Sequence, residues 1–261
     1  MQRRICSKTG LALTAGPVSA LRIARESYGP FDPLPRDASS DVEDWSRYDT
    51  VGRTIYASAD KLTAFMELLA PYRTDINGER RALQPLADFM GVPLEDLWRD
   101  IVSEWDAAGT MKASWLPRIF REGRSIYTVQ FPKGWWIDIT ASETISALAD
   151  ISQGAWSTAQ GMSDEPLTLS HLTGDDRLLT TSIATVLRED VSLDDGTLPL
   201  GIEFISKHGK PHNGTGTCWA YWMRDVDNGL DETAIVTASS PIEEDDKDFV
   251  AAQVLCKIKS R

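Results

Sequence analysis

The pattern of apolar and polar residues between 53 and about 72 predicts a strand followed by a helix. Residues 53–57, "RTIYA", are typical of a strand, and Ser58 is a suitable N-cap. The predicted helix continues to about Tyr72, because its apolar residues keep helical spacing: Leu62, Phe65, Met66 and Leu69.

Helical spacing returns between residues 83 and 109. Leu83, Leu86 and Met90 indicate one short helix. A second helix opens at Pro93 and ends at Gly109. It carries a continuous apolar stripe: Leu94, Leu97, Trp98, Ile101, Val102 and Trp105. We interpret about 73–120 as a mostly helical insertion.

The period then changes towards that of strands. Residues 125–131 and 135–140 predict a hairpin that turns at Pro132, Lys133 and Gly134, followed by a helix capped by Thr140 or Ser142. After a polar stretch, a helix is predicted over 176–190. Four further apolar segments are typical of strands: 200–206, 217–223, 232–239 and 252–260. In the last of them, apolar and polar residues alternate with period two.

Strands and helices are interspersed without a regular βαβ order, which predicts a single α+β domain. Residues 1–19 are expected to form an irregular N-terminal arm, and residues 20–261 the domain that contains the insertion. Within it, the Pro-, Asp- and Ser-rich region 20–50 is expected to be a long loop.

Composition narrows the function classes. Apolar residues make up 42% and charged residues 25% of the chain, which predicts a packed core. The net charge is -12, from 39 acidic and 27 basic residues, so non-specific binding to nucleic acid or to an anionic membrane is not expected. Three scattered cysteines argue against a disulfide framework and favour the cytoplasm. Gly10, Gly16 and Pro17 interrupt what would be the apolar part of a signal peptide.

The usual catalytic motifs do not occur. His208, His212 and Cys218 lie in or beside a Gly- and Pro-rich segment, where their spacing favours a loop between strands over a metal site. "GTGT" lacks the strand and helix of a dinucleotide fingerprint, and neither a GxxxxGK loop nor a GxSxG elbow is present.

Five polar residues remain as candidates, each with an ordinary alternative: Arg22, Arg47, Tyr56, Glu67 and Ser206. Arg22 could be a surface cation, Tyr56 a strand residue with a solvated hydroxyl and Ser206 a turn residue. Glu67 lies about 150° from the centre of its helix's apolar stripe, at about 100° per residue. Periodicity alone therefore predicts that Glu67 is exposed.

Taken together, the motifs resemble those of the RES domain family, which is named for its Arg, Glu and Ser. The chain reads "ALRIARES" at 20–27, "SRYD" at 46–49, "TIYASADKLTAFMELL" at 54–69 and "GIEFISKHG" at 201–209. The register from Tyr56 to Glu67 is the most specific part. The family's GRWN motif is replaced by Ser-Arg-Tyr-Asp, so its Gly and Asn are absent.

The resemblance implies the fold of ADP-ribosyltransferases of the diphtheria-toxin type. It also implies an NAD-consuming enzyme that cleaves the nicotinamide N-glycosidic bond, with water or phosphate as acceptor. NAD is then the substrate, no metal is needed, and the chain is a toxin controlled by an antitoxin protein. Two alternatives stay open: a protein ADP-ribosyltransferase, and a catalytically silent binding module, which the altered GRWN motif favours.

The resemblance also assigns roles to residues. Glu67 stabilises the oxocarbenium-like state, and Tyr56, with Tyr48 as second choice, stacks on nicotinamide. Arg22 and Arg47 bind phosphate or ribose hydroxyls. The family serine corresponds either to Ser206 or to a hydroxyl of the 176–190 helix, namely Thr180, Thr181 or Ser182. With these roles, Glu67 is expected to lie near Arg22 and Tyr56 and to line a pocket.

Overall fold

The computed structural model describes residues 2–16, 18–73, 83–109, 115–151, 166–231 and 233–260. Its strands are β1 (Arg3–Ile5), β2 (Ala12–Ala15), β3 (Ser19–Arg25), β4 (Thr54–Ser58), β5 (Trp115–Leu116), β6 (Arg124–Gln130), β7 (Trp135–Asp138), β8 (Gly201–Ile205), β9 (Thr217–Trp222), β10 (Ile235–Pro241) and β11 (Lys259–Ser260). Its α-helices are α1 (Lys61–Leu69), α3 (Gln84–Met90), α4 (Leu94–Ala107), α5 (Arg118–Glu122), α6 (Ser142–Ile151), α8 (Leu169–Thr173), α9 (Arg177–Glu189), α10 (Arg224–Asn228) and α11 (Lys247–Cys256). Two 3-10 helices are η1 (Val42–Asp44) and η2 (Ala70–Tyr72).

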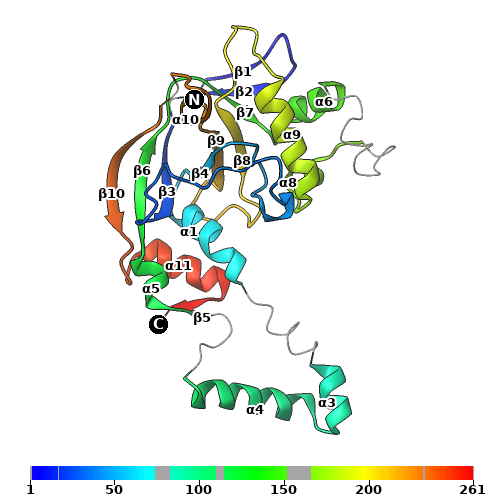
Figure 1. Ribbon diagram of the computed structural model, residues 1–261, viewed down its shortest axis with the longest axis vertical. Coiled ribbons are helices and arrows are strands. Elements are labelled where there is room, and N and C mark those ends of the chain that lie inside the picture. The colour runs from blue at the N-terminus through cyan, green and yellow to red at the C-terminus, as the bar shows by residue number, and fades with distance from the viewer. Residues whose placement is uncertain are drawn as a thin grey trace.

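One large sheet organises the molecule. Among the described residues it has nine strands in the order β1-β2-β7-β8-β9-β4-β3-β6-β10 (Figure 1). Its pairs are antiparallel except for β7 with β8. A mixed sheet flanked by helices that do not follow a βαβ order confirms the predicted α+β class.

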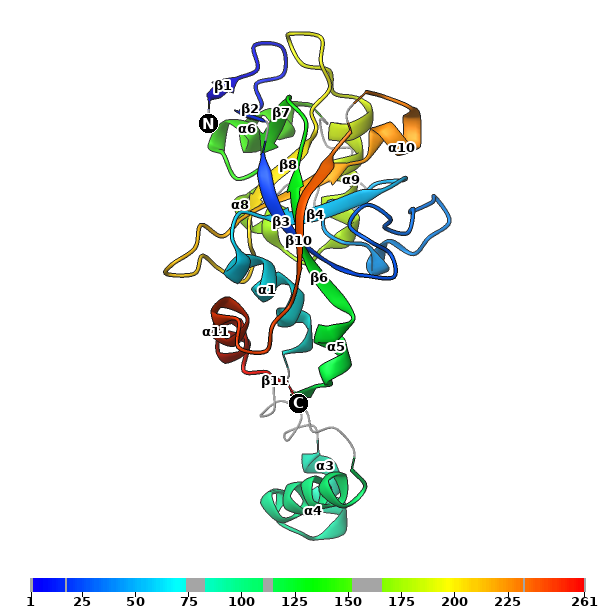
Figure 2. The same ribbon diagram turned by 90° about the vertical axis from the view of Figure 1, so that its left-hand side faces the viewer.

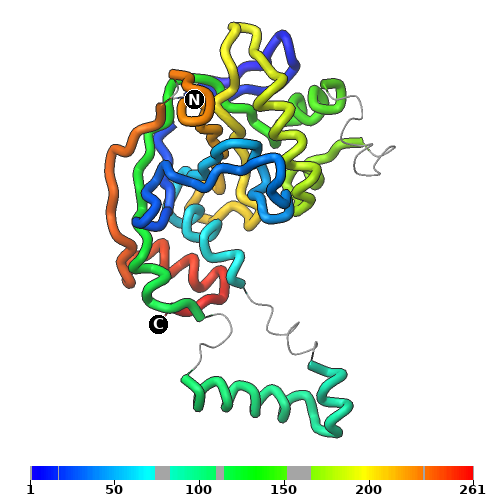
Figure 3. Tube along the Cα trace, in the orientation of Figure 1, coloured from blue at the N-terminus to red at the C-terminus, as the bar shows by residue number. Residues whose placement is uncertain are grey.

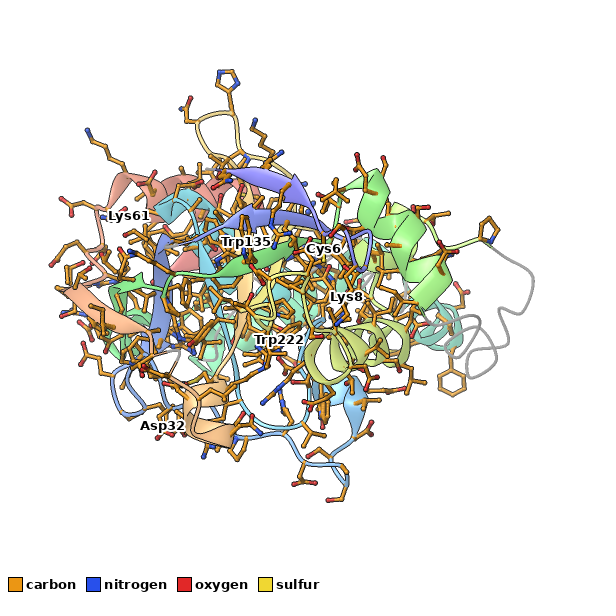
Figure 4. All side chains as sticks on the ribbon, turned by 90° about the horizontal axis from the view of Figure 1, so that it is seen from above. Cys6, Lys8, Asp32, Lys61, Trp135 and Trp222 are labelled. Carbon is orange, nitrogen blue, oxygen red and sulfur yellow. The ribbon has the colours of Figure 1, made fainter. Side chains whose placement is uncertain are left out.

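Three buried clusters surround the sheet. Helices α6, α8 and α9 cover one face of the β7-β8-β9-β4 part, over a cluster that includes Tyr48 and Trp222. Residues of β3 and β6 meet those of β4, β7 and β9 in a second cluster around Trp136 and Trp219. A third joins α1 and α11 to β6 (Figure 2). Trp222, labelled in Figure 4, lies in the crowded interior.

The predicted helical insertion contains α3 and α4, which extend away from the rest of the molecule (Figures 1 and 3). Trp98 and Trp105 of the predicted apolar stripe contact each other edge to face, with ring centroids 5.7 Å apart. No helix among the described residues has both the length and the apolar character needed to cross a bilayer.

The predicted hairpin over 125–140 is wrong, although both of its strands exist. β6 pairs with β3 and β10, whereas β7 pairs with β2 and β8. The strands therefore belong to separate parts of the sheet. Their apolar residues still meet in the second cluster, where the Phe131 and Trp136 rings lie 5.1 Å apart. Burial of these aromatic rings, not strand pairing, holds the two ends of the turn together.

The predicted strand over 252–260 is also wrong for most of its length, since residues up to Cys256 belong to α11. Asp246 caps this helix by accepting from the backbone N–H groups of Asp248 and Phe249. Phe249, Ala252 and Cys256 are buried at helical spacing in the cluster that also holds α1. Helical packing replaces the period-two pattern here, and Val254, one of the alternating apolar residues, is exposed.

The N-terminal region is more regular than expected. β1 and β2, predicted as an irregular arm, form the edge of the sheet. β3 occupies the start of the predicted 20–50 loop and pairs with β6 along its whole length, from Ser19 to Arg25. The residues rich in Pro, Asp and Ser begin only after this strand, and the strand's own burial does not alternate strictly.

Candidate functional site

The pocket lies where two strands of the sheet separate. Among the described residues, the β3–β4 ladder consists of the single pair Leu21 and Ser58. Next to it, Arg22 of β3 donates from Nη1 to the carbonyl of Tyr56 on β4 at 3.0 Å, and from Nε to the carbonyl of Pro30 at 2.7 Å. A side chain thus satisfies a carbonyl at the point where the strands diverge.

The pocket has a volume of about 350 Å³ and opens between the β3–β4 split, α1 and the loop after β8. Its polar and aromatic lining comes from distant parts of the chain: Arg22, Trp45, Ser46, Arg47, Tyr56, Ser58, Glu67, Arg177, Phe204, Lys207, His208 and Cys218. The structure therefore brings together Glu67, Arg22 and Tyr56 as the sequence predicts, and Arg47 with them.

Local structure places Glu67 on the pocket side of α1. Asp60, and not the predicted Ser58, caps the helix by accepting from the Thr63 N–H at 2.8 Å. Phe65 and Leu69 are fully buried in the cluster shared with α11, which turns the flank carrying Glu67 towards the split between the strands.

Glu67 is half-buried rather than exposed. Its Oε1 atom is withdrawn from solvent and has no hydrogen-bond partner among the described residues. A buried carboxylate oxygen without a donor is costly, so such an atom in a pocket is typical of a group that binds a ligand. This corrects the exposure that periodicity predicts. The apolar stripe gives the direction of the core, but a cleft borders the other side.

Tyr56 is held rigidly in the pocket wall. Its hydroxyl donates to Asp49 Oδ1 at 2.9 Å and accepts from the Tyr48 N–H at 3.0 Å. Its ring meets Phe204 edge to face at 6.3 Å. Burial and the nearby Asp49 carboxylate raise the pKa of Tyr56 well above its usual value. The ring therefore offers an aromatic wall, while the hydroxyl is committed to structure.

Two arginines have different surroundings in the pocket. Burial lowers the pKa of Arg22 to about 10, so the guanidinium remains a cation at neutral pH. Arg47 donates from Nε to the carbonyl of Gly174 at 3.2 Å and lies over the rings of Tyr48 and Phe204. Both guanidinium groups are thus oriented by the protein before any ligand binds.

Four predicted binding residues are not among the described residues that line the pocket. Tyr48 is fully buried and donates its hydroxyl to the carbonyl of Leu172, with its pKa raised to about 12 by burial. Thr180 and Thr181 are buried and donate to helix carbonyls one turn earlier. Ser206 is also buried, and its hydroxyl accepts from the His208 N–H at 3.1 Å. Ser206 therefore shapes the loop that carries His208.

Among the basic residues of the lining, sequence reasoning did not assign Arg177, Lys207 and His208 to the site. The available signal was position, because Arg177 opens the predicted 176–190 helix and the other two directly follow Ser206. Burial lowers the pKa of His208, and the Glu67 carboxylate opposes that shift. Burial also raises the pKa of Cys218 to about 12, which makes its thiol a poor nucleophile.

Within the described parts of the chain, no group of three or more His, Cys, Asp or Glu side chains is arranged to hold a metal ion. His208 lines the pocket, whereas His212 is exposed on the same loop. The described lining of the pocket thus has one carboxylate, that of Glu67, together with arginine and lysine side chains and the rings of Tyr56 and Phe204.

Comparison with known proteins gives little further information. No family model matches the chain, and no curated protein matches it. Among solved structures, it is similar to the M. tuberculosis MbcT-MbcA toxin-antitoxin complex, with 11% identity and a TM-score of 0.40. The similarity covers 94% of this chain and 92% of that one. At this score and identity, the match assigns no role to any residue, and the RES resemblance stays a prediction.

Proposed function

We propose that the pocket binds NAD and that the protein cleaves the bond between nicotinamide and ribose. The observation that carries this proposal is the buried, unpartnered Oε1 of Glu67 in a pocket lined by Arg22, Arg47 and Tyr56. The predicted resemblance to the RES family supports it, because these are the residues to which that resemblance assigns roles.

Glu67 supplies the stabilisation that the reaction needs. When the N-glycosidic bond breaks, its electron pair passes to the ring nitrogen, and nicotinamide leaves as a neutral molecule. Positive charge then develops on the ribose, in an oxocarbenium-like state. A carboxylate oxygen without an internal donor is free to stabilise that charge or to accept from a ribose hydroxyl.

The other lining groups orient the substrate. The ring of Tyr56 is fixed by its hydroxyl and provides a face for the cationic nicotinamide ring. Arg22 and Arg47 attract the anionic part of the dinucleotide, although the chain as a whole carries a net charge of -12. A cationic pocket in an acidic protein favours an anionic ligand at that place.

The reaction is completed when an acceptor, water or inorganic phosphate, attaches to the ribose carbon that has lost nicotinamide. Water attaches through its oxygen to the ribose carbon and releases one proton, which yields ADP-ribose. Inorganic phosphate attaches in the same way. The predicted resemblance further implies that the chain acts as a toxin and that an antitoxin protein covers the pocket.

The test is to incubate purified, folded protein with NAD, with and without phosphate, and to follow nicotinamide by chromatography. We expect nicotinamide release in at least one condition. Labelled NAD added to a cell lysate separates the alternative of protein ADP-ribosylation, which produces discrete labelled bands. Folded protein that releases no nicotinamide in any of these conditions contradicts the proposal.

A further inference from the structure

One side of the pocket carries a cluster of three cations, of which the proposed function uses only Arg47. Arg177 is the first residue of α9, Lys207 lies just after β8, and Arg47 lies in the loop before β4. A single carboxylate, that of Asp175, lies among these three cations. Its Oδ1 accepts from Arg177 Nη2 at 3.3 Å and from Lys207 Nζ.

These groups form one electrostatic unit with the catalytic side of the pocket. His208 lines the same pocket, where burial lowers its pKa and the charges of Glu67, Lys207, Arg47 and Asp175 also act on it. Arg47 also holds the carbonyl of Gly174, the residue before Asp175. The short segment that joins α8 to α9 is therefore fastened to the pocket at two consecutive residues.

Arg177 is incompletely satisfied in this arrangement. Its Nη1 atom is buried and has no hydrogen-bond partner among the described residues. A guanidinium presents a rigid fork of donors that matches phosphate oxygens, and Lys adds a mobile point charge. Three cations against one carboxylate leave the cluster with an excess of positive charge.

Asp175 is held only weakly. Its side chain is 71% exposed, and exposed ion pairs contribute little to stability. An incoming anion can therefore replace the carboxylate on both cations at small cost, and the carboxylate can move into solvent. A phosphoryl group, with more oxygens and more charge than a carboxylate, is the anion best suited to the three cations.

We propose that Arg177, Lys207 and Arg47 form a phosphoryl subsite for the diphosphate of a dinucleotide, and that Asp175 competes with the ligand for this subsite. The proposal rests on the proposed function for the identity of the dinucleotide. The subsite itself rests only on the cluster. It assigns specificity to the cations, since a nucleoside monophosphate offers one phosphate where NAD and ADP offer two.

Binding, measured by calorimetry, tests the subsite without requiring turnover. The probes are ADP, inorganic pyrophosphate and inorganic phosphate. We expect ADP to bind and its Kd to rise about tenfold in Arg177→Met and in Lys207→Met, since each loses a charge-assisted hydrogen bond. We expect Asp175→Asn to lower the Kd by about threefold, because it removes the competing charge.

Arg118→Met is the matched control. It removes one positive charge and breaks an exposed pair, that of Arg118 with Glu122 on α5, but it lies outside the pocket lining. Its Kd for ADP should equal that of the unmodified protein. Lys207→Met keeps the test valid if Arg177→Met fails to fold, because Lys207 lies in a loop.

The binding experiments distinguish failure of the phosphoryl subsite from failure of the proposed function. If ADP binds with the expected dependence on Arg177 but NAD is not cleaved, the subsite stands and the proposed function fails. If only inorganic phosphate binds, with the same dependence, the cations serve free phosphate and the diphosphate assignment is overturned. If Arg177→Met and Lys207→Met bind all three probes as Arg118→Met does, the subsite is overturned, whether or not NAD is cleaved.

Discussion

Glu67 and Glu203 are both withdrawn from solvent, yet their carboxylates have different surroundings. Glu203 Oε2 accepts from Thr14 Oγ1 at 3.1 Å and from Trp219 Nε1 at 3.0 Å. Glu67 Oε1 is buried without any partner among the described residues. Glu203 alternates on β8 with Phe204, which lines the pocket, so Glu203 faces the other side of the sheet.

The comparison separates two uses of a buried carboxylate. Around Glu203, the fold provides the donors itself, and the acid joins β2, β8 and β9. Around Glu67, the described parts of the fold provide a wall of cations and aromatic rings but no donor to Oε1. A satisfied carboxylate stabilises the structure, whereas an unsatisfied one in a pocket is available to a ligand.

The largest effect is expected at Glu67. Glu67→Gln should lower the kcat for nicotinamide release by about 100-fold or more, because the charge that stabilises the transition state is lost. Its free energy of unfolding should change by less than about 0.5 kcal/mol, since no donor among the described residues loses a partner at Oε1. Kinetics and urea denaturation measure the two quantities. A large loss of stability with little loss of kcat would show that Glu67 is structural.

Glu203 should show the opposite behaviour. Glu203→Ala leaves the donors of Thr14 and Trp219 buried and unpaired, which should lower the free energy of unfolding by about 2 to 4 kcal/mol. The kcat of the folded protein should be unchanged. Urea denaturation measures the loss, and Glu203→Gln, which keeps an acceptor, is the control. A loss equal to that of Glu203→Gln would refute the role of these hydrogen bonds.

A smaller effect should appear in the dependence of stability on pH. Burial raises the pKa of Glu203 in the folded protein above its ordinary value of 4.5. The stability associated with this shift is fully present below the ordinary pKa and is lost as pH rises through the raised pKa. Relative to Glu203→Gln, the unmodified protein should therefore become less stable as pH rises above the ordinary pKa of 4.5. Thermal denaturation across this range measures the difference. Parallel curves would contradict it.

The elements that sequence predicts well are those with a strong local period. α1, α4 and α9 each carry an apolar stripe, and the strand before α1 lies where the sequence predicts it. The failures occur where partners are distant in sequence. β6 and β7 have the composition of a hairpin but pair elsewhere, and α11 is a helix because it packs on α1.

The residues of the candidate site also divide into those that the sequence could select and those that only the structure identifies. Glu67, Arg22, Arg47 and Tyr56 could be selected because their motifs keep a recognisable register. Arg177 and Lys207 were not selected, since Arg177 lies in a predicted helix and Lys207 in the GIEFISKHG segment, where the resemblance assigns a role only to the serine. Only the approach of the α8–α9 segment to the loop after β8 shows that both cations meet Asp175.

The sequence by itself determined the α+β class, the helix that carries Glu67 and the residues placed with it, because helical period and local motifs depend on neighbours in the chain. The tertiary structure alone decided which strands pair and that β3 and β4 diverge. For Glu67 it decided between the exposure that periodicity predicts and the pocket that the resemblance predicts. The physical reason is that strand pairing and burial depend on contacts between distant segments. The same apolar stripe is compatible with either solvent or a cleft on its opposite side.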